Sequence, residues 1–77
     1  MANPSGTDAA LGDVLRAERE RQDRSQESLA HDAGLTTIAV GNIERGDSDP
    51  HWSTVRRIVD ALGLSMQELG KRLDKTR

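Results

Sequence analysis

The sequence predicts a small all-α domain built from five short helices. Apolar residues recur three and four positions apart, in stretches that end at glycines or polar clusters, as in amphipathic helices. Aromatic residues make up only 1% of the chain, which argues against a β-sandwich or a base-stacking platform. With no cysteine and two histidines among 77 residues, neither a disulfide framework nor the usual zinc site is available. A chain of this size forms one domain that relies on packed helices.

The first predicted helix covers about residues 8–22. Thr7 or Asp8 can cap its start, and its inward positions recur at helical spacing: Leu11, Val14 and Leu15. Asp23 and Arg24 then break the pattern. Residues 1–7 contain a proline and a glycine among small polar residues, and they are predicted to form a flexible leader.

The next two predicted helices are joined by a tight turn. Ser25 is a suitable N-cap for a helix over residues 26–33, and Gly34 follows where a C-cap favours positive φ. Thr36 caps a third helix over Thr37–Arg45. Two short helices joined by a glycine-bearing turn form the helix-turn-helix layout. On spacing alone, a generic α-hairpin remains the alternative.

Two more predicted helices complete the domain. The fourth covers about residues 52–62, with apolar residues at i, i+3, i+4 and i+7, and ends at Gly63. Ser65 and Glu68 form a capping box that opens a fifth helix, which reaches Leu73. The predicted helix-turn-helix domain therefore spans residues 8–73, and a basic C-terminal tail follows over residues 74–77.

Charge is distributed unevenly along the chain. The net charge is −2, but residues 25–50 carry −4 and residues 51–77 carry +3. No apolar run approaches the roughly 20 residues that span a bilayer, and no secretion signal is visible at the N-terminus. The predicted location is therefore the cytoplasm, without contact with a membrane.

Several stretches of the chain together resemble one family. They agree with it in order and spacing over roughly residues 11–73: Leu11–Glu20, Ser25–Leu35, Ile43–Gly46, Pro50 and Ala61–Ser65. The chain resembles the Cro/lambda-repressor-like family, of the xenobiotic-response-element type. This resemblance implies a compact five-helix lambda-repressor-like domain with its helix-turn-helix at helices two and three. It also implies binding to operator DNA as a homodimer on a palindrome, with the third helix in the major groove.

The resemblance also assigns a DNA-facing set of residues. Gln26 would bind phosphate and brace the recognition helix, whose start would face base edges or the sugar-phosphate. Asn42 would reach a base or a phosphate, and Arg45 would lie along the DNA backbone. A solvated helix start for Gln26, and capping alone for Thr36, are alternatives that involve no DNA. The full set is Gln26, Thr36, Thr37, Ile38, Gly41, Asn42 and Arg45.

A further pair implied by the resemblance is structural. Arg19 in the first helix and Glu44 at the end of the third would form a partly buried salt bridge. The pair would fix the first helix against the recognition helix. Removing either partner would leave a costly unpaired charge.

The chain departs from the family pattern in and beside the recognition helix. Positions 37, 38, 39 and 41 hold no Arg, Gln or Lys, so the usual bidentate base contacts are missing there. Gly41 lies inside the helix at a cost of about 1 kcal/mol relative to alanine. Asp47 and Asp49 lie in the following loop, where cations normally meet phosphate. We therefore expect weak, salt-sensitive DNA binding by a monomer. Arginines on the flanking helices would supply cations to the DNA phosphates. The alternative is that these arginines only form a solvated helix face: Arg16, Arg21, Arg24, Arg56 and Arg57.

The remaining polar and aromatic residues suggest no catalytic set. His31 and His51 are too scattered for a metal site, and Glu18 and Glu20 are predicted on a charged helix face without a pocket. Trp52, at the start of the fourth helix, is expected to pack into the core. No metal, cofactor or enzymatic activity is expected.

The leading prediction is sequence-specific binding of double-stranded DNA by a small transcriptional regulator, with repression as the favoured sign. The alternative is a protein-interaction module on the same fold, such as an antitoxin or adaptor subunit with weak or no DNA binding. The acidic middle third favours the alternative. Gln26, Thr36, Asn42 and Arg45 favour DNA.

Overall fold

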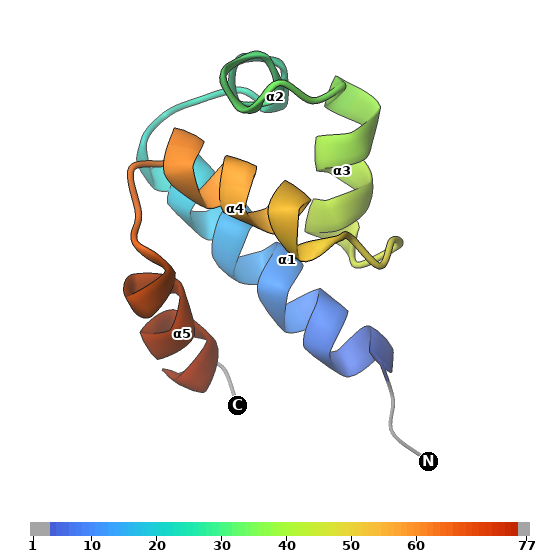
Figure 1. Cartoon of the computed structure of the whole chain (residues 1–77), viewed down its shortest axis with the longest axis vertical. Helices are drawn as coiled ribbons and strands as arrows, with labels where there is room; N and C mark the ends of the chain where they lie inside the picture. Colours follow the sequence, from blue (N-terminus) through green and yellow to red (C-terminus); the bar gives the residue numbers. More distant parts are fainter. Residues whose placement is uncertain (1–3, 76–77) are drawn as a thin grey trace.

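A computed structural model describes residues 4–75 of the chain. Over these residues the structure consists of helices and connecting turns without a strand, so the predicted all-α class is confirmed. Figure 1 shows α1 crossing the molecule, with α2 and α3 at one side and α5 at the other. The helices are α1 (Pro4–Arg21), α2 (Gln26–Ala33), α3 (Thr37–Arg45), α4 (Trp52–Ala61) and α5 (Met66–Lys75).

The two ends of the predicted domain differ from the structure. Helix α1 begins at Pro4, so the expected start at Asp8 is wrong and residues 4–7 are helical rather than a leader. Proline is tolerated in the first turn of a helix, where its missing N–H has no intrahelical partner. At the other end, α5 continues through Lys75 and takes in part of the predicted tail. The rest of the leader, residues 1–3, and of the tail, residues 76–77, lies outside the described residues.

The helix-turn-helix is formed as predicted, and local capping explains its boundaries. The Ser25 hydroxyl accepts a hydrogen bond from the Ser28 N–H at 3.0 Å, and Thr36 accepts one from the Ala39 N–H at 3.0 Å. Gly34 closes α2 with φ 71°, a left-handed conformation that glycine adopts without a steric penalty. These caps fix where α2 ends and where α3 begins.

The core lies where the apolar faces of the helices meet around α1. The predicted inward positions of α4 are buried, although the helix ends at Ala61 and Leu62 is its C-cap. The predicted capping box of α5 is present, since Glu68 N–H donates to Ser65 and Ser65 N–H donates to Glu68. Buried apolar residues come from all five helices and their turns: Val14, Leu15, Leu29, Ala30, Ala33, Val40, Ile43, Val55, Ile58, Val59, Leu62, Leu64 and Leu69.

The closest approach between α1 and α3 occurs at Gly12. A β-carbon built at this position would lie 2.5 Å from the carbonyl oxygens of both Ile43 and Glu44. Real side chains do not approach carbonyl oxygens so closely, so glycine is required for this crossing. The C-terminal end of α3 is thereby held directly against the backbone of α1.

Within residues 4–75, no helix is both long and apolar enough to cross a membrane. The same residues include no group of three or more His, Cys, Asp or Glu side chains placed to hold a metal ion.

Candidate nucleic-acid interface

Helix α3 presents two different faces. Val40, Ile43 and Glu44 are buried against the rest of the molecule. The start of the helix is exposed to solvent: Thr36 and Thr37 are exposed, and Ile38 is 75% exposed. Figure 1 shows α3 at the edge of the molecule, with its first turn next to the end of α2. The first turn of α3 therefore projects a small apolar and hydroxyl-bearing surface into solvent.

The other end of α3 is anchored through Glu44. Arg19 donates two hydrogen bonds to the Glu44 carboxylate, from Nε at 2.7 Å and from Nη2 at 3.0 Å. The side chain of Glu44 is only 2% exposed and that of Arg19 only 12%. These bonds to Glu44 raise the pKa of Arg19 above its ordinary value. The expected salt bridge between the first and third helices is therefore present, and it is bidentate and buried.

Two further contacts extend this anchor to α2 and to the preceding turn. Gln26 Nε2 donates to Glu44 Oε1 at 3.0 Å, so the first residue of α2 braces the end of α3. Arg19 Nη1 donates to the Arg24 carbonyl at 2.8 Å. Of the two roles expected for Gln26, the structure supplies the bracing role. Contact between Gln26 and phosphate remains a prediction.

Three of the other predicted residues gather along the C-terminal half of α3. Arg45 Nε donates to Asp47 at 3.0 Å, and Arg45 Nη2 donates to the side-chain oxygen of Asn42. Gly41 lies beneath this group, since a β-carbon there would be 3.1 Å from Arg45 Nη1 and 3.6 Å from Gln26 Oε1. Gly41, Asn42, Arg45 and Gln26 thus form one cluster, separate from the bare first turn of α3.

Three of the flanking arginines already pair with acidic side chains, so fewer of them are available to DNA phosphates. Arg24 pairs with Asp32 and donates to the Ala61 carbonyl at 2.6 Å, so this side chain ties α2 to the end of α4. Arg16 pairs with Glu20 on the surface. Arg21 pairs with Glu18. Arg56 and Arg57 are exposed on α4.

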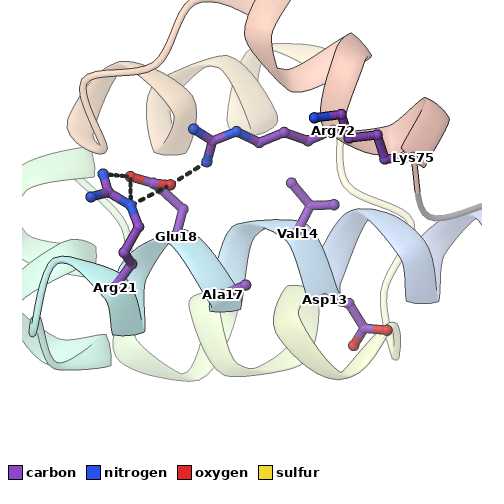
Figure 2. A pocket seen from close by; sticks show the side chains of 7 residues that line it. All are labelled: Asp13, Val14, Ala17, Glu18, Arg21, Arg72 and Lys75. Atoms are coloured by element: carbon purple, nitrogen blue, oxygen red, sulfur yellow. Dashed lines mark hydrogen bonds and ion pairs between the residues drawn. The ribbon is translucent and has the colours of Figure 1, made fainter.

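Glu18 does not lie on a solvated face as predicted. It is 2% exposed, and its carboxylate accepts hydrogen bonds from Arg21, from Arg72 of α5 and from Gln22 Nε2 at 2.8 Å. Figure 2 shows the guanidinium groups of Arg21 and Arg72 reaching this carboxylate from α1 and α5. A cavity of about 400 Å³ adjoins it, lined partly by Val14. The prediction failed because α5 covers this part of α1, and helical periodicity does not reveal that contact.

The charge of Glu18 links stability to pH. Its hydrogen bond from Arg21 lowers the pKa of Glu18 from 4.5 to about 2, against the opposing effect of burial and with help from Gln22 and Arg72. A depressed folded-state pKa stabilises the fold above the unfolded-state pKa, and the benefit is lost as pH falls through the interval between the two values. We therefore expect Glu18 to contribute up to about 3 kcal/mol at pH 6 that disappears between about pH 5 and 2.

Urea unfolding from pH 6 to 2 measures this contribution. Glu18→Gln is expected to be less stable at pH 6 and to show a shallower loss of unfolding free energy toward low pH. Glu20→Gln serves as the matched control, because Glu20 is 55% exposed and should leave the pH dependence close to that of the wild type. Equal pH dependence in both variants would contradict the role assigned to Glu18.

Trp52 also departs from its prediction. The side chain is 65% exposed rather than packed in the core. It occupies the first position of α4, at the margin of the buried stripe formed by Val55, Ile58 and Val59. At the far end of the helix, Leu62 belongs to the core and Ala61 packs against it. An indole is therefore displayed next to the α3–α4 loop.

A short helix, a turn closed by a left-handed glycine and a second helix displayed at the surface define a helix-turn-helix domain. The family model described as "Helix-turn-helix domain" matches residues 10–73, and the chain belongs to this family.

Relatives and solved structures agree with this assignment. The chain is 42% identical over 55 residues to an uncharacterized HTH-type transcriptional regulator of Mycobacterium tuberculosis, covering 71% of the chain and 22% of the relative. It is 32% identical to the restriction-modification controller protein C.AhdI from Aeromonas hydrophila, with TM-score 0.78, covering 80% of this chain and 94% of that one. The controller protein C.Esp1396I, solved as a tetramer with its 35 base-pair operator, shares the fold at 22% identity and TM-score 0.86, covering 90% and 91%. The chain spans about a fifth of the length of the curated relative.

Proposed function

We propose that this chain binds double-stranded DNA in a sequence-specific manner and regulates transcription, with α3 in the major groove. The observation that carries the proposal is the construction of α3. Its first turn is bare at Thr36, Thr37 and Ile38, while its last turn is locked by the buried Glu44 pair. A rigidly held helix with an exposed start has the form that direct readout in the major groove requires.

The chemistry of the exposed turn favours particular contacts. The methyl groups of Thr37 and Ile38 suit the C5-methyl of thymine, and the Thr hydroxyls can donate to phosphate or to base edges. The free amides at the start of a helix also favour phosphate. The acidic loop after α3 limits the number of phosphates that one copy can neutralise, so affinity should be modest and salt-dependent.

Because one copy of the chain is expected to bind DNA with only modest affinity, tight binding to an operator requires two copies. We propose a homodimer on a palindrome, joined through α5 and the basic residues at its end, with repression of the bound promoter as the outcome. A cytoplasmic location follows from this function. Binding that grows cooperatively with protein concentration, together with a two-fold symmetric footprint, would identify the dimer.

Replacing Asn42 with alanine tests the surface. Asn42→Ala is expected to weaken binding to a DNA duplex selected by the wild-type protein by about tenfold, because the side chain supplies polar contacts on the outer side of α3. Fluorescence anisotropy with labelled duplex measures the affinity, and circular dichroism checks that helicity is unchanged. Gln67→Ala is the comparison variant: it removes an exposed side-chain amide on α5, across the molecule from α3 (Figure 1), and so separates a loss at the proposed dimer contact from a loss at α3. Equal affinity of all three proteins would place the DNA elsewhere.

Trp52 favours a second candidate function. Trp52 is 65% exposed, and it follows a loop whose Asp47 and Asp49 are exposed as well, a combination that suits a basic, apolar protein surface better than it suits phosphates. A protein-interaction module, such as an adaptor or antitoxin, would use this end of the fold. Trp52→Ala should leave DNA affinity unchanged in that case, while the wild-type protein would show no preference among DNA sequences.

A further inference from the structure

Arg45 is held in a defined position on the outer side of α3. Its Nε donates to Asp47 Oδ2 at 3.0 Å, and its Nη2 donates to Asn42 Oδ1, one helical turn back. Its Nη1 lies over Gly41, 3.1 Å from the place where a β-carbon would be. The guanidinium therefore folds back along the recognition helix instead of extending from its C-terminal end.

The contacts leave part of the guanidinium available. An arginine side chain carries five N–H donors, one on Nε and two on each Nη. Asp47 takes the donor on Nε and Asn42 takes one on Nη2. The second Nη2 donor and both Nη1 donors have no hydrogen-bond acceptor among the described residues. The side chain as a whole is 59% exposed, so the guanidinium can be reached from solvent.

We propose that Arg45 reads a guanine in the major groove, and that Asn42, Asp47 and Gly41 position it to do so. Guanine presents two acceptors there, O6 and N7, which match two parallel N–H donors of one guanidinium. The bare first turn of α3 offers no such fork, so Arg45 supplies the bidentate base contact that the start of the helix lacks. This inference rests on the proposed DNA-binding function.

Gly41 fits this role. Glycine inside a helix is unfavourable, and nothing in the core requires it, because the nearest atoms to an added β-carbon belong to the Arg45 and Gln26 side chains. A β-carbon at 3.1 Å from Nη1 would force the guanidinium to shift by a few tenths of an ångström, out of the position that its hydrogen bonds hold. Gly41 therefore provides the space in which Arg45 lies flat.

Asp47 has two opposing effects in this arrangement. Its negative charge next to the DNA backbone lowers affinity for every sequence. Its contact with Arg45 restricts a flexible side chain and so favours one base over others. Removing the charge should therefore raise the affinity for DNA of any sequence and lower the preference for one base over the others. A charge acting only by repulsion would change the general affinity alone.

The first test replaces each guanine of a selected half-site in turn with 7-deazaguanine, which lacks the N7 acceptor. With wild-type protein we expect one position per half-site to lose about tenfold in affinity, and with Arg45→Ala that position should lose less than twofold. The proposal is overturned if no guanine shows this dependence on Arg45. It is also overturned if Arg45→Ala weakens selected and random duplexes equally and lowers the salt slope by about one, as loss of a phosphate contact would.

The second test separates positioning from charge. Asp47→Asn and Asp49→Asn each remove one negative charge from the same loop, but only Asp47 contacts Arg45. Both should bind random DNA about equally and more tightly than the wild type. Only Asp47→Asn should lower the preference for guanine over adenine at the sensitive position, by about threefold to fivefold. Equal preference in the two variants would overturn the positioning role.

Gly41→Ala gives an independent readout. Alanine should raise the melting temperature by about 5 °C through helix propensity, yet reduce the guanine preference by displacing Arg45. A more stable protein with unchanged guanine preference would contradict the proposal. If the wild-type protein selects no DNA sequence at all, the proposed function itself fails. If it selects sequences without an Arg45-dependent guanine, only this inference fails.

Discussion

Arg19→Ala is expected to lower the free energy of unfolding by about 3–5 kcal/mol, because it leaves the carboxylate of Glu44 buried without its charged partner. Glu44 is only 2% exposed on its side chain, and Gln26 alone cannot compensate a full charge. A chain of 77 residues has about 4–12 kcal/mol of total stability. Urea denaturation followed by circular dichroism should therefore show an unfolding midpoint at a much lower urea concentration than that of the wild type.

Two variants define what this result means. Arg16→Ala removes a pair exposed by more than half on each side, and it should cost less than about 0.5 kcal/mol. The double variant Arg19→Met with Glu44→Leu removes both charges together and should recover much of the stability lost by Arg19→Ala. A cost for Arg19→Ala as small as that for Arg16→Ala would show that Glu44 finds water or another partner.

Gly12→Ala is expected to destabilise the fold by about 3 kcal/mol. The added methyl group would lie 2.5 Å from two backbone carbonyl oxygens of α3, so α1 and α3 have to separate. Backbone atoms of a packed helix cannot rotate away as a side chain does. Because the same crossing holds the end of α3, DNA binding should weaken together with stability.

Gly70→Ala provides the comparison for Gly12→Ala. Gly70 lies inside α5 with no atom within 4 Å of an added β-carbon. The same chemical change should there stabilise the protein by about 0.5–1 kcal/mol, since alanine is the better helix former. Thermal unfolding of the two variants should shift the melting temperature in opposite directions. A shift of the same sign would mean that the close approach at Gly12 relaxes without cost.

Local signals predicted most of the fold correctly. Ser25 and Thr36 fix helix starts through hydrogen bonds to a backbone N–H three residues on, and Gly34 ends a helix through its own backbone conformation. Each of these depends on a few consecutive residues, which is why the sequence displays them. The resemblance to a known family added the pairing of Arg19 with Glu44, which lie 25 positions apart.

The failed predictions for Glu18 and Trp52 concern how side chains pack, whereas the failed start of α1 concerns a local boundary. Nothing near Glu18 in the chain indicates that Arg72 covers it, and an acidic residue in a charged stretch is ordinarily solvated. Trp52 is 65% exposed at the first position of α4, ahead of the buried residues Val55, Ile58 and Val59. The close approach at Gly12 is likewise a contact between distant segments, since the carbonyl oxygens it meets belong to Ile43 and Glu44.

The sequence predicted which residues belong to the candidate site, but not how their side chains lie relative to one another. The order of Gln26, Gly41, Asn42 and Arg45 along the chain does not reveal that they form one cluster. Rotamers and neighbouring charges decide where a long side chain such as arginine lies. The position of Arg45 over Gly41 is therefore information that only the structure supplies.

Selection of bound fragments from randomised duplex DNA, at about physiological salt, tests the central claim most directly. We expect enrichment of a palindrome whose half-sites are about one helical turn apart, with thymines facing the first turn of α3. Titration of the enriched duplex against random duplex should show at least a hundredfold preference, approaching the range of about 10³–10⁷ typical of full operators. No enrichment, with weak binding that rising salt abolishes equally for all sequences, would contradict sequence-specific DNA recognition by this chain.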